Sequence, residues 1–130
     1  TAAIKALKKF NVKNLAVFTP YSKKLNDEVI QYIEDEGFNV TSNSYFGIES
    51  DVDIGKVDQN YLYDVLSKID VDGADALFIS CTALPALSLI EKLEKKLNKI
   101  VLSSNQALIW DTLQEIGNKE PIEGFGKLFR

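Results

Sequence analysis

The only cysteine of the chain, Cys81, lies in the stretch ALFISCTALP (residues 76–85), directly after an apolar run and shortly before a proline. One interpretation is structural, because a buried cysteine packs as a small apolar residue. The other is chemical. The Thr-Ala-Leu-Pro sequence predicts that a helix begins within a few residues, and a thiol facing a helix N-terminus has its thiolate stabilised by the free N–H groups. Such a thiol can transfer a proton or add to an activated double bond.

The chain has no histidine, so the commonest general base of enzymes is absent. Chemistry would therefore rest on the thiol, carboxylates, tyrosines, hydroxyls or amides. Tyr21 ends the stretch FTPY, and its phenol can hydrogen-bond a carboxylate or transfer a proton, unless it is only a surface aromatic. One cysteine and no tight carboxylate cluster predict that no metal is bound.

Three predicted strand ends carry small hydroxyl or amide residues just before a helix: FTPY (18–21), SCTALP (80–85) and LSSNQ (102–106). Helix capping explains each of them singly. Three such ends at one edge of a sheet, with exposed helix N-termini, would also form a good site for a carboxylate or phosphate. From their positions, Thr82, Ser104 and Asn105 are predicted to bind such an anion.

The elements that would position these residues follow from hydrophobic patterning. Four β-type runs cover residues 15–20, 38–47, 76–81 and 99–104. The first, third and fourth are nearly continuous apolar stretches, typical of parallel strands covered on both faces, whereas the second alternates and suits an edge. Helical spacing predicts helices over residues 22–36, 56–70, 84–97 and 106–116, the third with Pro85 in its first turn.

Alternating β and α units predict an α/β fold, specifically a three-layer, flavodoxin-like domain with a four-stranded parallel sheet. In such sheets ligands bind at the carboxyl ends of the strands. Two acidic or charged stretches are interpreted as surface: ESDVDIGKVD (49–58) as a loop that caps the next helix, and EKLEKK (91–96) as a solvated helix face with a Glu91–Lys95 pair.

Length and composition predict a single domain over residues 1–130, with an ordinary apolar fraction of 45%. The 15 basic and 19 acidic residues give a net charge of −4, which disfavours nucleic acid as a partner. No signal-peptide pattern or membrane-spanning apolar run is present, and a single cysteine fits the reducing cytoplasm. The chain starts at Thr1 inside a helical pattern, so we expect it to be part of a longer polypeptide.

Several stretches together resemble the maleate cis–trans isomerase group of the aspartate/glutamate racemase superfamily, which includes arylmalonate decarboxylase. They are VFTPY followed by Asn26, FGIESD, ADALFISCTALP, IVLSSNQALIWDTL and GFGKLF. The resemblance implies two similar α/β halves with the active site between them, and no metal or organic cofactor. It also implies that isomerases use one cysteine from each half: one attacks the alkene, and the other assists at the opposite carbon.

By this resemblance the chain is the C-terminal half, Cys81 matches the second cysteine, and Tyr21 matches the tyrosine that holds a substrate carboxylate. A position that is often asparagine in maleate isomerases falls near Asp51. An acidic residue there would repel a dicarboxylate, so either the match shifts by a residue or the substrate differs. Arylmalonate decarboxylases typically have glycines after the cysteine, whereas this chain has Thr82-Ala83, which favours the isomerases.

The sequence thus predicts a cofactor-independent isomerase of the maleate isomerase type, acting on a small mono- or dicarboxylate. Cys81 would be the acid–base or nucleophilic group, and the predicted substrate-binding residues are Tyr21, Asp51, Thr82, Ser104 and Asn105. A missing N-terminal half, or a second copy in a homo-oligomer, would complete the site. Malonate-type decarboxylation and amino-acid racemisation are alternatives within the class. An inactive carboxylate-binding or dimerising domain is the alternative outside it.

Overall fold

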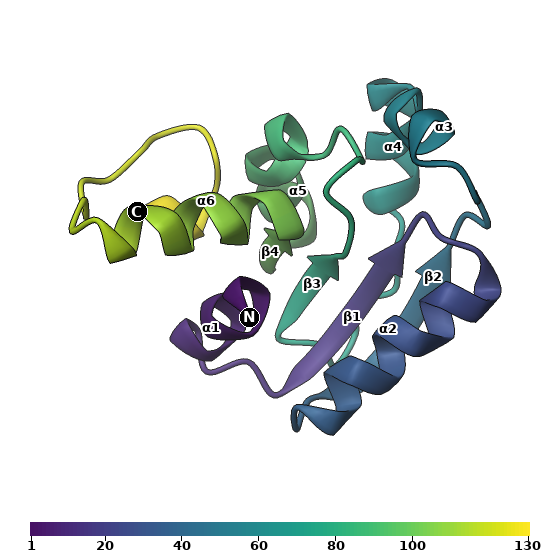
Figure 1. Ribbon diagram of the computed structural model, residues 1–130, viewed down its shortest axis with the longest axis horizontal. Helices are drawn as coiled ribbons and strands as arrows, with labels where there is room; N and C mark the ends of the chain where they lie inside the picture. Colours follow the sequence, from purple (N-terminus) through teal and green to yellow (C-terminus); the bar gives the residue numbers. More distant parts are fainter.

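The computed structural model describes residues 1–130 and contains one sheet of four parallel strands in the order β2-β1-β3-β4 (Figure 1). This is the strand order of flavodoxin-like sheets, so the predicted α/β class is confirmed. The strands are β1 (Asn14–Thr19), β2 (Asn39–Tyr45), β3 (Ala76–Ile79) and β4 (Ile100–Ser103). The helices are α1 (Ala2–Lys9), α2 (Lys23–Asp35), α3 (Asp51–Gly55), α4 (Gln59–Leu66), α5 (Ile90–Leu97) and α6 (Ser104–Glu115), with short 3₁₀ helices η1 (Leu87–Leu89) and η2 (Lys127–Phe129).

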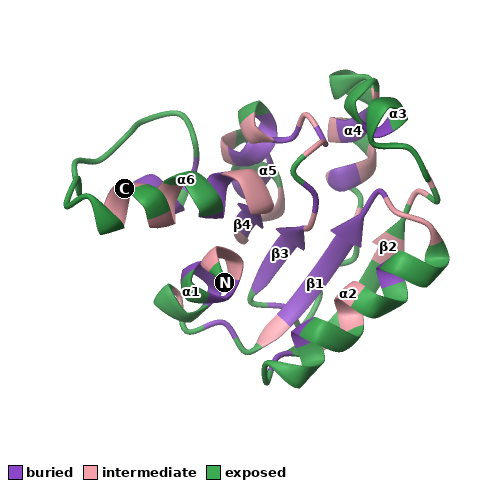
Figure 2. Ribbon diagram, viewed as in Figure 1, coloured by how far each residue is buried: buried purple, intermediate pink, exposed green.

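Helices cover both faces of the sheet, because successive side chains of each strand point to opposite sides and both sides are apolar. On one face, Phe18 of β1 belongs to a buried cluster with residues of α3, α4 and α5. On the other, Val17 belongs to a second cluster with residues of α1, α2 and α6. Figure 2 shows the buried strands β1, β3 and β4 between helices whose outer sides are exposed. These two cores give the three predicted layers.

The predicted character of the strands is also confirmed. β1 and β3 lie in the middle of the sheet and are buried along almost their whole length. β2 lies at an edge and alternates between exposed and half-buried residues, as its sequence pattern indicated. Helix α2 ends just before Gly37, which has a φ of +99° and therefore a conformation that favours glycine.

Two predictions about helices are wrong. No helix begins at Pro85; residues 80–86 are irregular, and helical structure begins only at Leu87. A proline disfavours the helical conformation in the residue before it, here Leu84, which is instead buried in the core. The acidic stretch 49–58 is also more than a loop, because it contains α3, although Asp58 does cap α4 by accepting a hydrogen bond from the N–H of Tyr61 at 2.9 Å.

The last residues, 117–130, form a C-terminal strap that folds back from the end of α6 towards α5 (Figure 1). Glu94 of α5 anchors it. Its carboxylate is only 6% exposed and accepts hydrogen bonds from the N–H groups of Lys127 at 2.9 Å and Val101 at 3.1 Å. Burial raises the pKa of Glu94, and these two backbone N–H groups oppose that shift. The prediction of a fully solvated face over 91–96 is therefore wrong, and Glu91 pairs with Arg130 of the strap rather than with Lys95.

Asp75 fixes the start of β1 and gives a prediction about pH. Its Oδ2 accepts hydrogen bonds from the N–H groups of Lys13 and Asn14, both at 2.9 Å, and these bonds lower the pKa of Asp75. A lowered pKa in the folded state stabilises the protein at neutral pH, and this stabilisation is lost as the pH falls through that value. Asp75→Asn should therefore reduce the free energy of unfolding at pH 7 more than at pH 2.

The measurement is urea denaturation of both proteins at the two pH values. Asp72→Asn is the matched control, since Asp72 is an exposed acid in the same connection before β3. Asp72→Asn should change the free energy of unfolding little at either pH. Equal losses at pH 7 and pH 2 for Asp75→Asn would contradict a role for the ionised carboxylate.

Candidate active site at the strand ends

Cys81 follows β3 at the carboxyl edge of the sheet. The N–H of Ser80 donates to the carbonyl oxygen of Phe18 at 3.0 Å, which extends the pairing of β3 with β1 up to the cysteine. The thiol is 5% exposed, and its sulfur accepts a hydrogen bond from the N–H of Ala83 at 3.3 Å. The expectation that a helix N-terminus faces this thiol is therefore wrong. The sulfur instead accepts from a single N–H, that of Ala83 in the irregular turn before η1.

Tyr21 brings a phenol to the same place. It lies just beyond β1 and packs against the buried cluster that contains Cys81. Burial raises the pKa of the Tyr21 phenol, and its interactions with Cys81 and Asp51 raise it further. The phenol therefore stays protonated at neutral pH and is available as a hydrogen-bond donor. Tyr21 and Cys81 thus belong to one cluster at the carboxyl edge of the sheet.

The connection after β2 brings Asp51 towards this pair. Two hydrogen bonds fix the backbone of this connection to the end of β1. The N–H of Ile48 donates to the carbonyl oxygen of Pro20, and the N–H of Gly47 donates to the carbonyl oxygen of Tyr21, both at 2.8 Å. Helix α3 follows, and its Ile54 is buried in the cluster that contains Cys81. Asp51 lies one helical turn before Ile54, on the same side of α3.

Thr82 and Asn105 also come together, as predicted. The side-chain amide of Asn105 donates to the carbonyl oxygen of Thr82 at 2.7 Å, which joins the turn after β3 to the start of α6. Both residues line a cavity of about 340 Å³, together with Gln59 and Phe125. The Asn105 amide therefore supports the turn that carries the thiol, because its Nδ2 donates to the backbone of that turn.

Ser104 lies apart from this group. It lines another cavity, of about 290 Å³, together with Ser80 and with apolar residues of α1 and α2 such as Leu7 and Val29. This cavity is on the α1–α2 face of the sheet, whereas Thr82 and Asn105 face the α4–α5 side. Ser103, just before it, is the N-cap of α6: its hydroxyl accepts a hydrogen bond from the N–H of Gln106.

A buried polar pair, which was not predicted from the sequence, joins the end of β1 to α2. The Thr19 hydroxyl, at the end of β1, donates to Oδ1 of Asn26 at 2.7 Å, and both residues are fully buried. The Nδ2 atom of Asn26 has no hydrogen-bond partner in the chain. A usable signal was present in the sequence, because Asn26 shares its helix face with Val29 and Ile33, where an apolar residue is expected.

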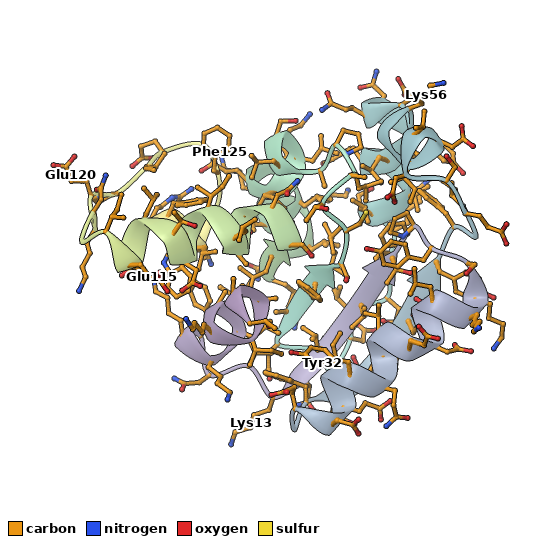
Figure 3. All side chains as sticks on the ribbon, viewed as in Figure 1. Lys13, Tyr32, Lys56, Glu115, Glu120 and Phe125 are labelled. Carbon is orange, nitrogen blue, oxygen red and sulfur yellow. The ribbon has the colours of Figure 1, made fainter.

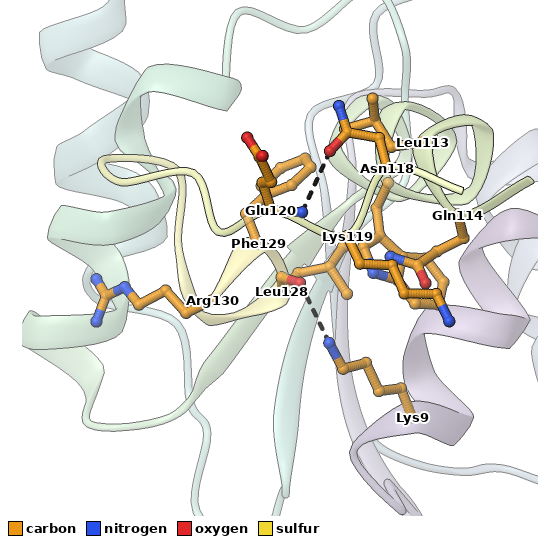
Figure 4. Close-up of a pocket in the computed structure, with 10 residues that line it drawn as sticks. Lys9, Leu113, Gln114, Asn118, Lys119, Glu120, Leu128, Phe129 and Arg130 are labelled. Carbon is orange, nitrogen blue, oxygen red and sulfur yellow. Dashed lines mark hydrogen bonds between the residues drawn. The ribbon is translucent and has the colours of Figure 1, made fainter. Parts of the chain in front are cut away.

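The remaining cavities lie elsewhere. One of about 190 Å³ is lined by Lys9, Trp110 and residues 118–120 and 128–130 of the strap, at the C-terminal end of α6 (Figure 4). Cys81 and Tyr21 line none of the five cavities of the chain. No group of three or more potential metal ligands is present, and no helix is long and apolar enough to cross a membrane.

Fold and site together define a flavodoxin-like α/β domain that carries a thiol and a phenol at its strand ends. Residues 1–129 match the arylmalonate decarboxylase family model, and the chain belongs to this family. It is similar to the maleate isomerase of Geobacillus stearothermophilus, with 30% identity over 128 residues, and to the arylmalonate decarboxylase of Bordetella bronchiseptica, with 26% identity over 132 residues. The resemblance seen in the sequence is thus confirmed.

Solved structures of the same group are similar over nearly the whole chain. A maleate cis–trans isomerase from Nocardia farcinica, with a covalently bound succinylcysteine intermediate, has a TM-score of 0.94 at 25% identity, and the match covers 99% of this chain and 53% of that one. A maleate isomerase from Pseudomonas putida with maleate has a TM-score of 0.93 at 27% identity, covering 98% and 52%. The chain spans about half the length of the curated relatives it matches.

Proposed function

We propose that the chain is half of a cofactor-independent cis–trans isomerase that acts on a small unsaturated carboxylate by cysteine thiol chemistry. The observation that carries the proposal is that Cys81 and Tyr21 belong to one cluster at the carboxyl edge of the sheet. Similarity to maleate isomerases, one of them with a succinylcysteine intermediate, supports it. A single free thiol is suited to the reducing cytoplasm, where we place the protein.

The chemistry requires two groups on opposite sides of the alkene. A thiolate adds to one alkene carbon, and the electron pair of the double bond moves to the other alkene carbon and into the carboxyl group attached to it. The central bond is then single and can rotate, and loss of the thiolate restores the double bond in the trans form. Cys81 is either the thiolate that adds or the thiol that gives and regains a proton at the other carbon. The protonated Tyr21 donates a hydrogen bond to the substrate carboxylate.

A second half, N-terminal to this one, or a second copy of the chain would close the site. The match covers only about half of each relative, and neither Cys81 nor Tyr21 lines a cavity within these 130 residues. Electrostatic preorganisation needs donors on every side of the reacting atoms, so one wall alone would bind weakly and turn over little. We therefore assign the activity to the protein as encoded, meaning the whole product of the gene, and not to these 130 residues alone.

Malonate-type decarboxylation is the second candidate, because the family model that matches is that of arylmalonate decarboxylase. In that reaction Cys81 would protonate the enediolate that remains after loss of carbon dioxide. Thr82 and Ala83 beside the thiol favour isomerisation, since the family resemblance implies glycines after the cysteine in typical decarboxylases.

Tyr21→Phe tests the proposal. In the protein as encoded, assayed with maleate and its monoamide maleamate without added metal or cofactor, this change should lower kcat/KM by about a hundredfold, the typical effect of losing one donor to developing charge. Formation of the trans product is followed by proton NMR. Tyr63→Phe is the matched control, because Tyr63 packs against the same cluster but places its ring under Lys92.

The outcomes separate the candidates. Trans product from the unmodified protein, and its loss in Tyr21→Phe alone, supports the isomerase. Release of carbon dioxide from arylmalonates without isomerisation would replace it by the decarboxylase. If an amino acid is racemised instead, the racemase alternative holds. Binding of these acids with no turnover would leave a carboxylate-binding domain.

A further inference from the structure

Asp51 is an exposed acid, and the backbone around it is fixed at the edge of the sheet that carries Tyr21 and Cys81. Backbone hydrogen bonds from residues 46–48 to residues 19–21 fix the start of its connection beside Tyr21. At the other end, α3 is held by Ile54, which is 1% exposed in the cluster with Cys81, and by Gly55, which lies against the carbonyl oxygen of Ala83. Asp51 is therefore held between the connection beside Tyr21 and the buried part of α3. Its negative charge acts on the Tyr21 phenol.

No cation of the chain neutralises this carboxylate. The four ion pairs involve Asp111, Asp27, Asp64 and Glu91, none of which belongs to the site. Lys56, the nearest basic residue along the chain, lies at the far end of α3 and points to the outside of the molecule (Figure 3). The cavity beside Thr82 and Asn105 contains no lysine or arginine in its wall either.

We propose that Asp51 sets substrate specificity: it excludes a second carboxylate and accepts a hydrogen bond from a neutral donor, such as a primary amide, at that end of the substrate. The inference rests on the proposed function and names its substrate class, an unsaturated monocarboxylate with an amide or similar donor at its other end. The phenol of Tyr21 donates to the carboxylate, and Asp51 accepts from the amide. The charge of Asp51 would repel a substrate carboxylate placed beside it and not a neutral amide, which gives the discrimination.

Asp51→Asn in the protein as encoded tests this with two substrates of equal shape. Maleamate carries one carboxylate and one amide, whereas maleate carries two carboxylates. We expect the unmodified protein to have a kcat/KM at least about tenfold higher for maleamate, and Asp51→Asn to shift this ratio by at least about tenfold towards maleate. Asp53→Asn removes the same charge from the same helix, but from a side about 160° away, and should leave the ratio unchanged.

A second readout needs no turnover. Iodoacetate and iodoacetamide differ in one negative charge and both alkylate a thiol, so the ratio of their rates at Cys81, followed by peptide mass spectrometry, reports the local charge. Asp51→Asn should raise the relative rate of iodoacetate at least about threefold, and Asp53→Asn should not. An unchanged ratio would overturn the inference even if neither substrate is converted. Loss of isomerisation with a changed alkylation ratio would instead overturn the proposed function alone.

Discussion

Cys81→Ser in the protein as encoded is expected to reduce isomerase turnover by at least about a thousandfold, or about 4 kcal/mol in transition-state stabilisation. A serine hydroxyl is a far weaker acid and nucleophile than a thiol, and the chain has no histidine to activate it. The fold should survive, because the change is small and the N–H of Ala83, which donates to the sulfur, can donate to the serine oxygen. Proton NMR of the product and circular dichroism of the variant measure the two effects.

Ser80→Ala is the control for this prediction. Ser80 precedes the cysteine, but its side chain lines the cavity on the other face of the sheet. Turnover should stay within about threefold of the unmodified protein, as for a surface polar change away from the reacting groups. If Cys81→Ser instead retained turnover, the thiol would be a packing residue, and the chemistry would have to be assigned to other groups.

Gly126→Ala is expected to have the largest effect on stability, a loss of about 3 kcal/mol in the free energy of unfolding. Gly126 has a φ of +91°, and an added Cβ would lie 2.7 Å from Cγ2 of Ile90 and 3.0 Å from Oε1 of Glu94. The first contact is too short for any carbon pair, and the second disturbs the carboxylate that anchors the strap. Urea denaturation, followed by the fluorescence of Trp110, gives the free energy.

Gly124→Ala separates the two causes of that loss. Gly124 has a similar φ of +94°, but nothing lies within 4 Å of its added Cβ. Its alanine variant should therefore show the backbone strain alone, about 1 kcal/mol. Equal losses for the two variants would contradict the close packing of the strap against α5. The strap also holds α6, since the Gln106 amide donates to the carbonyl oxygen of Phe125 at 2.8 Å.

The parallel sheet was predictable because each strand has a simple local signal. Continuous apolar runs indicated β1 and β3, which are covered on both faces, and the alternation over 38–47 indicated the edge strand β2. The placement of Cys81 and Tyr21 at one edge of the sheet followed from the rule that parallel strands bring their carboxyl ends together. These inferences use only the pattern within an element and the topology of the fold.

Other features depend on contacts between distant segments, which local pattern does not encode. The burial of Glu94 requires the strap, 33 residues further along the chain, to supply the N–H of Lys127. The late start of the helical structure after β3 goes with the effect of Pro85 on Leu84 and with burial of Leu84 in the cluster shared by α3, α4 and α5. Ser104 was grouped with Thr82 by its strand-end position, but the direction of its side chain depends on where α6 turns away from the sheet.

The most direct test of the account is the rate at which iodoacetamide alkylates Cys81 with and without substrate, measured by peptide mass spectrometry on the protein as encoded. The proposal puts the thiol against the bound substrate, so saturating maleamate should slow the alkylation at least about tenfold, as occupancy of a site at ten times Kd or more would. The same addition should give much weaker protection in Tyr21→Phe at equal concentration. An alkylation rate that is the same with and without maleamate, in a protein that converts it, would contradict the central claim that Cys81 lies at the reacting atoms.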